Sequence, residues 1–91
     1  MDTEKKISPF DNRIIKVIDR LISDGAVKSR HDFCRKIDVQ QSLLYRIEKG
    51  ERGFSLNNII TICKLFNVNP NYIFGFEKSM FRLTPQTLKN S

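Results

Sequence analysis

Few side chains in this sequence have the types and spacing that catalysis or metal binding requires. His31 is the only histidine, and the two cysteines, Cys34 and Cys63, do not form a CxxC pair. A structural zinc site needs about four such ligands, so no metal site is expected. Both cysteines lie in apolar patterns, which favours reduced thiols in a core. There is no credible Ser/His/Asp set and no glycine-rich phosphate loop, so the sequence predicts neither an enzyme nor a bound cofactor.

The segment from Gln40 to Ile47 offers a different chemistry, because it is rich in hydrogen-bonding side chains and contains no acid. A glutamine can pair with the edge of adenine, an arginine with the edge of guanine, and a serine with either. The chemistry available here is therefore recognition by hydrogen bonding.

The size and composition of the chain limit what can position this segment. Its 91 residues and 10.7 kDa suffice for one domain with one modest core. With 40% hydrophobic and 29% charged residues, the composition is that of a globular protein. No apolar run approaches the ~20 residues that span a bilayer. The first ten residues are polar and include Asp2 and Glu4, unlike a signal peptide, so we expect a cytoplasmic location.

The positive charge of the chain is unevenly distributed. The formal net charge is +6. Residues 1–27 carry no net charge, whereas residues 28–52 and residues 53–91 each carry an excess of three positive charges. This distribution is compatible with a polyanionic partner for the second and third parts of the chain, although charge alone does not identify one.

Helix start and stop signals recur along the first half of the chain. A first helix is predicted from Ser8-Pro9 to Gly25, with an apolar residue every three or four positions. A second, short helix starts at Ser29, where the carboxylate of Asp32 is expected to reach back to the N–H of the cap. Asp38 tolerates a positive φ and marks a tight turn. A third helix is predicted from Gln40 or Gln41 to Lys49, before Gly50, with Leu44 and Ile47 facing inward.

The second half of the chain carries two further helix signals. Ser55 is predicted to cap a fourth helix, and Asn67 to end it. Asn69-Pro70 opens a short fifth helix that Gly75 closes. The apolar face predicted for the fourth helix consists of Leu56, Ile59, Ile60, Cys63 and Phe66. The aromatic residues predicted to pack in the core are Phe10, Phe33, Phe54, Phe66, Tyr72 and Phe74. We therefore divide the chain into an N-terminal tail (1–8), a domain (9–76) and a C-terminal tail (77–91).

The segment from Ser29 to Gly50 meets the physical requirements of a helix-turn-helix. Two short helices are joined by a tight turn, and the small Cys34 lies where the second helix must approach closely. Apolar positions lock the pair onto the other helices, which leaves the outer face of the second helix free. These positions are Phe33, Ile37, Val39, Leu44 and Ile47.

This segment resembles the helix-turn-helix of the Cro/phage-repressor (Xre-type) family. The matching positions are Ser29, Phe33, Ile37, Val39, Ser42, Leu44, Ile47, Glu48 and Gly50, and the likeness continues through Leu56 to Pro70. The sequence departs from the family pattern at Arg30, Cys34 and Asp38, where the family has Gln, Ala and Gly. The resemblance implies an all-α, five-helix, repressor-like DNA-binding domain whose second and third helices form the helix-turn-helix.

The resemblance also implies where such a domain would contact DNA. The third helix would enter the major groove of double-stranded DNA with its N-terminal residues on base edges. Carried over by position, the base-contacting residues are Gln40, Gln41, Ser42, Tyr45 and Arg46. The phosphate-contacting residues are Ser29, Arg30, Lys49 and Arg52. Leu43 could face either way, and Glu48 is expected to be structural, bonding the following loop or pairing with an arginine.

The resemblance favours a transcriptional regulator, most simply a repressor that acts as a homodimer, because one module makes few base contacts. Apolar residues left over outside the core suggest dimer contacts from the fifth helix and the tail, through Phe76, Met80, Phe81 and Leu83. An alternative is the DNA-binding, protein-interaction half of a toxin–antitoxin or restriction-control system, with a protein partner on the C-terminal tail. A second alternative is a non-specific nucleoid or RNA-binding protein.

Overall fold

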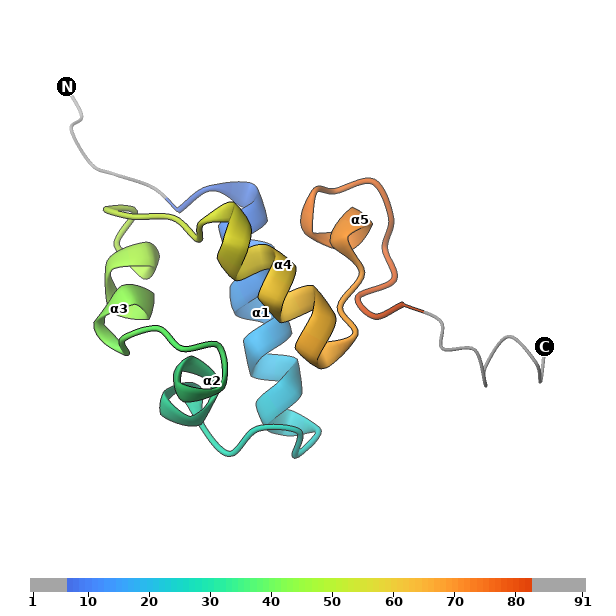
Figure 1. Ribbon diagram of the computed structural model, residues 1–91. Coiled ribbons are helices and arrows are strands. Elements are labelled where there is room, and N and C mark those ends of the chain that lie inside the picture. Colours follow the sequence, from blue (N-terminus) through green and yellow to red (C-terminus); the bar gives the residue numbers. More distant parts are fainter. Residues whose placement is uncertain (1–6, 83–91) are drawn as a thin grey trace, which may run out of the picture.

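The computed structural model describes residues 7–82, which contain five helices (Figure 1). The helices are α1 (Pro9–Ser23), α2 (Arg30–Lys36), α3 (Ser42–Glu48), α4 (Leu56–Phe66) and α5 (Pro70–Ile73). In Figure 1, α4 crosses in front of α1, with α2 and α3 on one side and α5 on the other. The only strand-like pairing in the described part of the chain is an antiparallel bridge between Val68 and Phe81. The all-α, five-helix fold expected from the sequence is thus confirmed.

Each helix contributes at least one fully buried side chain to a single core. α1 contributes most, and one large residue comes from each of the other helices. The residues with no exposed surface in the five helices are Ile14, Val17, Ile18, Phe33, Ile47, Ile62 and Ile73. Burial of such a side chain stabilises a fold by about 1.5–3 kcal/mol. The helices are short, and this shared core is what holds them in place.

The aromatic residues divide between the core and the surface. Phe33 and Phe66 stack with ring centroids 5.4 Å apart, and Phe54 is buried. The prediction is wrong for Phe10 and Phe74, which are 42% and 44% exposed. Their rings lie 6.3 Å apart and contact each other at the surface instead.

The predicted inner face of α4 is also partly wrong. Leu56 and Ile60 are 66% and 42% exposed, whereas Ile62 is fully buried. The buried stripe follows Ile59, Ile62 and Cys63, with Phe66 half-buried. In an α-helix, more than one set of residues recurs at three- and four-residue spacing, and packing against the neighbouring helices decides which set is buried.

The helix ends follow their predicted signals closely. Ser8, Ser29 and Ser55 each accept a hydrogen bond from the third residue of their helix, and Asn58 completes a capping box at α4. The carboxylate of Asp32 differs from the prediction. It accepts from the N–H of Lys28 (2.9 Å), one residue before the cap, instead of from Ser29.

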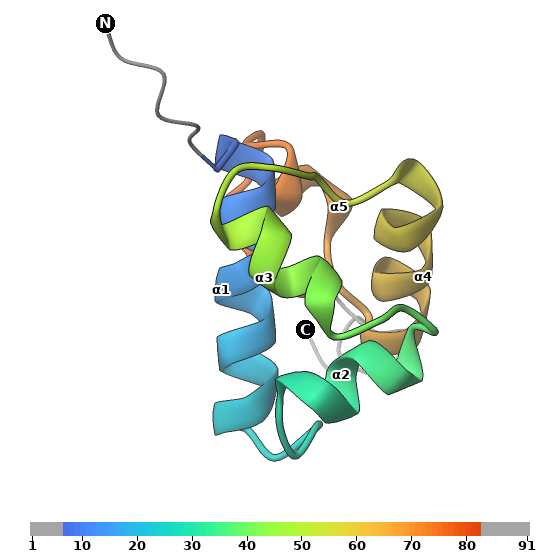
Figure 2. The same cartoon turned by 90° about the vertical axis from the view of Figure 1, so that its left-hand side faces the viewer.

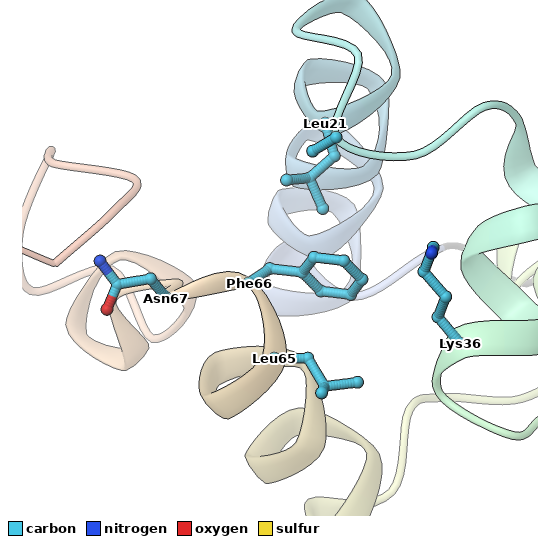
Figure 3. Close-up of a pocket in the computed structure, with 6 residues that line it drawn as sticks. Leu21, Lys36, Leu65, Phe66 and Asn67 are labelled. Carbon is cyan, nitrogen blue, oxygen red and sulfur yellow. The ribbon is translucent and has the colours of Figure 1, made fainter.

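Residues 77–82, placed in the tail by the sequence, return to the domain. The N–H of Asn69 donates to the carbonyl of Met80, and the N–H of Arg82 donates to the carbonyl of Asn67. Met80 and Phe81 are partly buried against the core. Elsewhere, the ends of α1, α2 and α4 border an open groove of about 620 Å³ (Figure 3). Leu83 and the rest of the predicted tail lie outside the described residues.

Candidate nucleic-acid interface

The turn between α2 and α3 fixes the orientation of α3. α2 ends at Lys36, and the turn that follows contains a residue with positive φ, Asp38 (φ 61°), as predicted. The N–H of Asp38 donates to Arg35 and the N–H of Val39 donates to Cys34, so the last carbonyls of the helix are satisfied. Cys34 is 1% exposed, as the close approach of the helices requires.

Only one side of α3 is anchored in the protein. Leu44 and Ile47 are buried, whereas Leu43 is half-buried: it packs against the core and also borders a hollow on the outer side. The helix begins at Ser42, one or two residues later than predicted, with Gln41 as its N-cap and no side-chain cap. Figure 2 shows α3 in front of the other helices, so its outer face is uncovered by them.

The structure brings the five predicted base-contacting side chains together on this outer face. All five residues, Gln40, Gln41, Ser42, Tyr45 and Arg46, are exposed. Three of them, Gln40, Ser42 and Arg46, line a shallow hollow together with Leu43 and one predicted phosphate contact, Arg52. The geometry thus provides glutamine, serine and arginine groups on one surface, with a cation beside them.

Arg30, a predicted phosphate contact, has partners inside the protein. Its guanidinium donates to Glu48 of α3 (2.7 Å) and to Asp19 of α1 (3.4 Å), so it links three helices. The hydrogen bond with Glu48 raises the pKa of Arg30 above its ordinary value. The same bond confirms that Glu48 pairs with an arginine. It also offsets the negative charge that Glu48 would otherwise present beside the exposed face of α3.

The other predicted phosphate contacts flank the two helices. Ser29 is exposed, and its hydroxyl oxygen accepts from the N–H of Asp32. Lys49 and Arg52 are exposed after the end of α3. The Lys49 ammonium lies 4.6 Å from the centre of the Tyr45 ring, and hydrogen bonding to Tyr45 raises the pKa of Lys49. Lys49 and Arg52 therefore place exposed positive charge after the C-terminal end of α3.

Sequence reasoning missed two features around this face. His31 was considered only as an isolated histidine, yet its Nδ1 lies 3.0 Å from Oε1 of Gln41. Asp11, the third residue of α1, is buried and accepts a hydrogen bond from the N–H of Phe54 (3.1 Å) across the fold. This bond ties the loop after α3 to α1. Both contacts join residues far apart in sequence, where spacing carries no signal.

The remaining titratable groups do not suggest a reactive centre. Cys34 and Cys63 are free and buried, as predicted, and burial raises the pKa of each thiol. Within residues 7–82, no group of three His, Cys, Asp or Glu side chains could hold a metal ion. None of the helices there is both long and apolar enough to cross a membrane.

Comparison with known proteins matches residues 28–73, half of the chain, to the Helix-turn-helix family HTH_3. The matched segment begins just before α2 and ends with α5, so it contains the whole candidate interface. No curated protein and no solved structure matches the chain.

Proposed function

The chain belongs to the Cro/C1-type helix-turn-helix family of DNA-binding domains, and from that premise we propose that it is a transcriptional regulator that recognises a specific duplex sequence as a homodimer. The observation that carries this proposal is the exposed polar face of α3, whose one acid, Glu48, is paired with Arg30. Its exposed glutamine, serine and arginine side chains match the hydrogen-bonding patterns of base edges in the major groove. Occupation of an operator by such a protein would repress transcription by excluding the polymerase.

The proposed phosphate contacts fix the register of α3 in the groove. Lys49 and Arg52 follow α3, and Ser29 and Arg30 lie at the start of α2, so the contacts bracket the groove on both sides. Each phosphate contact releases counterions, so affinity is expected to fall by about 0.9 log units per contact for each tenfold rise in salt.

A second exposed surface, which is apolar where the α3 face is polar, supports the homodimer. Phe10, Phe74 and Phe76 are 42%, 44% and 80% exposed, and we call them the aromatic surface. Arg13 lies among them, because its guanidinium reaches the carbonyl of Ile73 and borders a hollow with Phe76. Exposed apolar groups of this kind mark protein contacts, and a two-fold contact needs the same patch from both subunits.

The aromatic surface replaces part of the dimer contact inferred from the sequence. Phe76 remains a candidate, whereas Met80 and Phe81 are occupied by the protein's own core and Leu83 lies outside the described residues. The same aromatic surface is the observation in favour of a second candidate function, in which this DNA-binding chain works with a different protein as partner.

Selection of random duplex DNA by the purified protein tests the proposal. We expect retained sequences to share an inverted repeat with half-site centres about 34–36 Å apart, or a multiple of that distance. A motif without a repeat would favour a monomer or a different protein partner. Retention with no common motif would contradict sequence recognition and favour non-specific binding.

A further inference from the structure

The contact between His31 and Gln41 joins the start of α2 to the start of α3. Nδ1 of His31 lies 3.0 Å from Oε1 of Gln41. An amide oxygen is only an acceptor, so the imidazole donates the hydrogen from Nδ1. Both residues are exposed, and the contact lies on the same side of the molecule as the proposed base-contacting face.

Two neighbouring features indicate that His31 is the group that orients the Gln41 side chain. Arg30, the preceding residue, is directed to Glu48 and Asp19 and so does not hold Gln41. Gln41 is the N-cap residue of α3, but its side chain makes no cap hydrogen bond. The backbone of α3 therefore does not orient the Gln41 amide, and the bond from His31 does.

We propose that His31 is a positioning residue that holds the Gln41 amide ready to recognise an adenine. This inference rests on the proposed function. A glutamine pairs with adenine by accepting from N6 and donating to N7, which requires a fixed amide plane. One lone pair of Oε1 is used by His31, so the second lone pair and the Nε2 hydrogens remain for the base. Pre-ordering the side chain lowers the entropic cost of binding.

The test compares His31→Ala with His31→Gln, Gln41→Ala and the double variant. For His31→Ala, we expect affinity for the selected site to fall by about two- to tenfold, the cost of ordering one long side chain. Base preference should weaken at the single base pair whose preference Gln41→Ala also removes. His31→Gln, which can donate the same hydrogen bond, should restore the preference. The double variant should bind no worse than Gln41→Ala alone.

Two further readouts separate positioning from other roles. The slope of affinity against salt should be the same in His31→Ala as in the unmodified protein. In the absence of DNA, the side-chain amide NMR signal of Gln41 should move in His31→Ala but not in Lys36→Ala, a control at the exposed far end of α2.

Several results would overturn the inference. An unchanged preference in His31→Ala, or an unmoved Gln41 amide signal, would show that His31 does not hold the amide. Equal weakening on all sequences with a shallower salt slope would make His31 a phosphate contact instead. If the unmodified protein selected no sequence motif, the proposed function and this inference would both fail. If it selected a motif that His31→Ala left intact, only the inference would fail.

Discussion

The α3 face and the aromatic surface differ in whether other residues of the protein hold their side chains in place. Around α3, long polar side chains are held by partners in the protein: Arg30 by Glu48 and Asp19, and Gln41 by His31. On the aromatic surface, the rings of Phe10 and Phe74 contact each other, but both remain more than 40% exposed and Phe76 is 80% exposed. The first arrangement fixes hydrogen-bonding groups in direction, whereas the second leaves apolar area facing water.

This difference indicates two kinds of partner. Recognition of base edges depends on direction, so side chains that are already oriented lose less entropy on binding. Association between protein surfaces depends mainly on apolar area removed from water, which the exposed rings supply. The two surfaces should therefore respond to substitution independently, and each can be altered without disturbing the core.

The largest expected effect is on association through the aromatic surface. Phe74→Ser combined with Phe76→Ser should convert the protein to a monomer in sedimentation and weaken binding to the full inverted repeat. We expect a loss of about 30-fold or more, because a central aromatic hot spot contributes at least about 2 kcal/mol. Affinity for a single half-site should be unchanged.

Leu65→Ser is the matched control, because Leu65 is 55% exposed on α4 but borders the groove of Figure 3 rather than the aromatic surface. An association constant that the double substitution leaves intact would remove the aromatic surface from the dimer. Equal loss with Leu65→Ser would indicate a non-specific effect of lost apolar area.

The next largest effect is expected at the α3 face. Arg46→Ala should weaken binding to the selected site by about 1–3 kcal/mol and blur the preference at one base pair, because an arginine–guanine pair is lost. Arg52→Ala should weaken binding to all sequences alike and reduce the salt slope by about one contact. Titrations on selected and scrambled DNA at several salt concentrations measure both. The reverse pattern would mean that the two assignments are exchanged.

The helix boundaries were predictable because their signals are local. Serine caps, proline at the first helical position and positive-φ residues at the ends act within a few residues of the chain. Even the departure at Asp38 was readable, because an aspartate tolerates the left-handed region that the turn needs.

The incorrect predictions concern which apolar side chains are buried, because helices far apart in the sequence determine that burial. Leu56 and Ile60 fit the helical period as well as Ile62 does, and only the position of the other helices decides which residues are buried. Phe10 and Phe74 fit apolar faces but meet at an edge of the molecule.

The candidate site shows the same division between local and distant information. Its exposed residues could be named from the helix-turn-helix pattern alone. The partners that orient them could not, because His31 and Gln41 are ten residues apart and Arg30 and Glu48 are eighteen apart. Such pairs form only when the turn at Asp38 brings the two helices together.

A smaller effect is expected at the turn that sets the angle between α2 and α3. Asp38 has φ 61°, whereas the equivalent residues after α1, α3 and α5 are glycines. The left-handed conformation costs a residue with a Cβ about 1–2 kcal/mol, partly offset by the entropy that glycine loses on folding. Asp38→Gly should therefore raise the free energy of unfolding by up to about 1 kcal/mol.

Asp38→Ala is the matched comparison and should lower stability, because alanine has neither the flexibility of glycine nor a polar side chain. Chemical denaturation measures both variants. A less stable Asp38→Gly protein would mean that the aspartate side chain contributes more than its backbone strain costs. Dimerisation of the protein through the aromatic surface should be unchanged in both variants.

The smallest effect is a pH dependence confined to the start of α2. The N–H of Lys28 donates to the Asp32 carboxylate, and this bond lowers the pKa of Asp32 below its ordinary value. Because its pKa is lower in the folded than in the unfolded protein, Asp32 stabilises the fold above about pH 4, and the contribution is lost as the pH falls through the folded pKa. Asp32→Asn should therefore be less stable than the unmodified protein at neutral pH, and the difference should shrink in acid. Thermal unfolding from pH 7 to pH 3 measures it. A difference that stayed constant with pH would show that the carboxylate's charge does not matter, and that Asp32 acts through its shape alone.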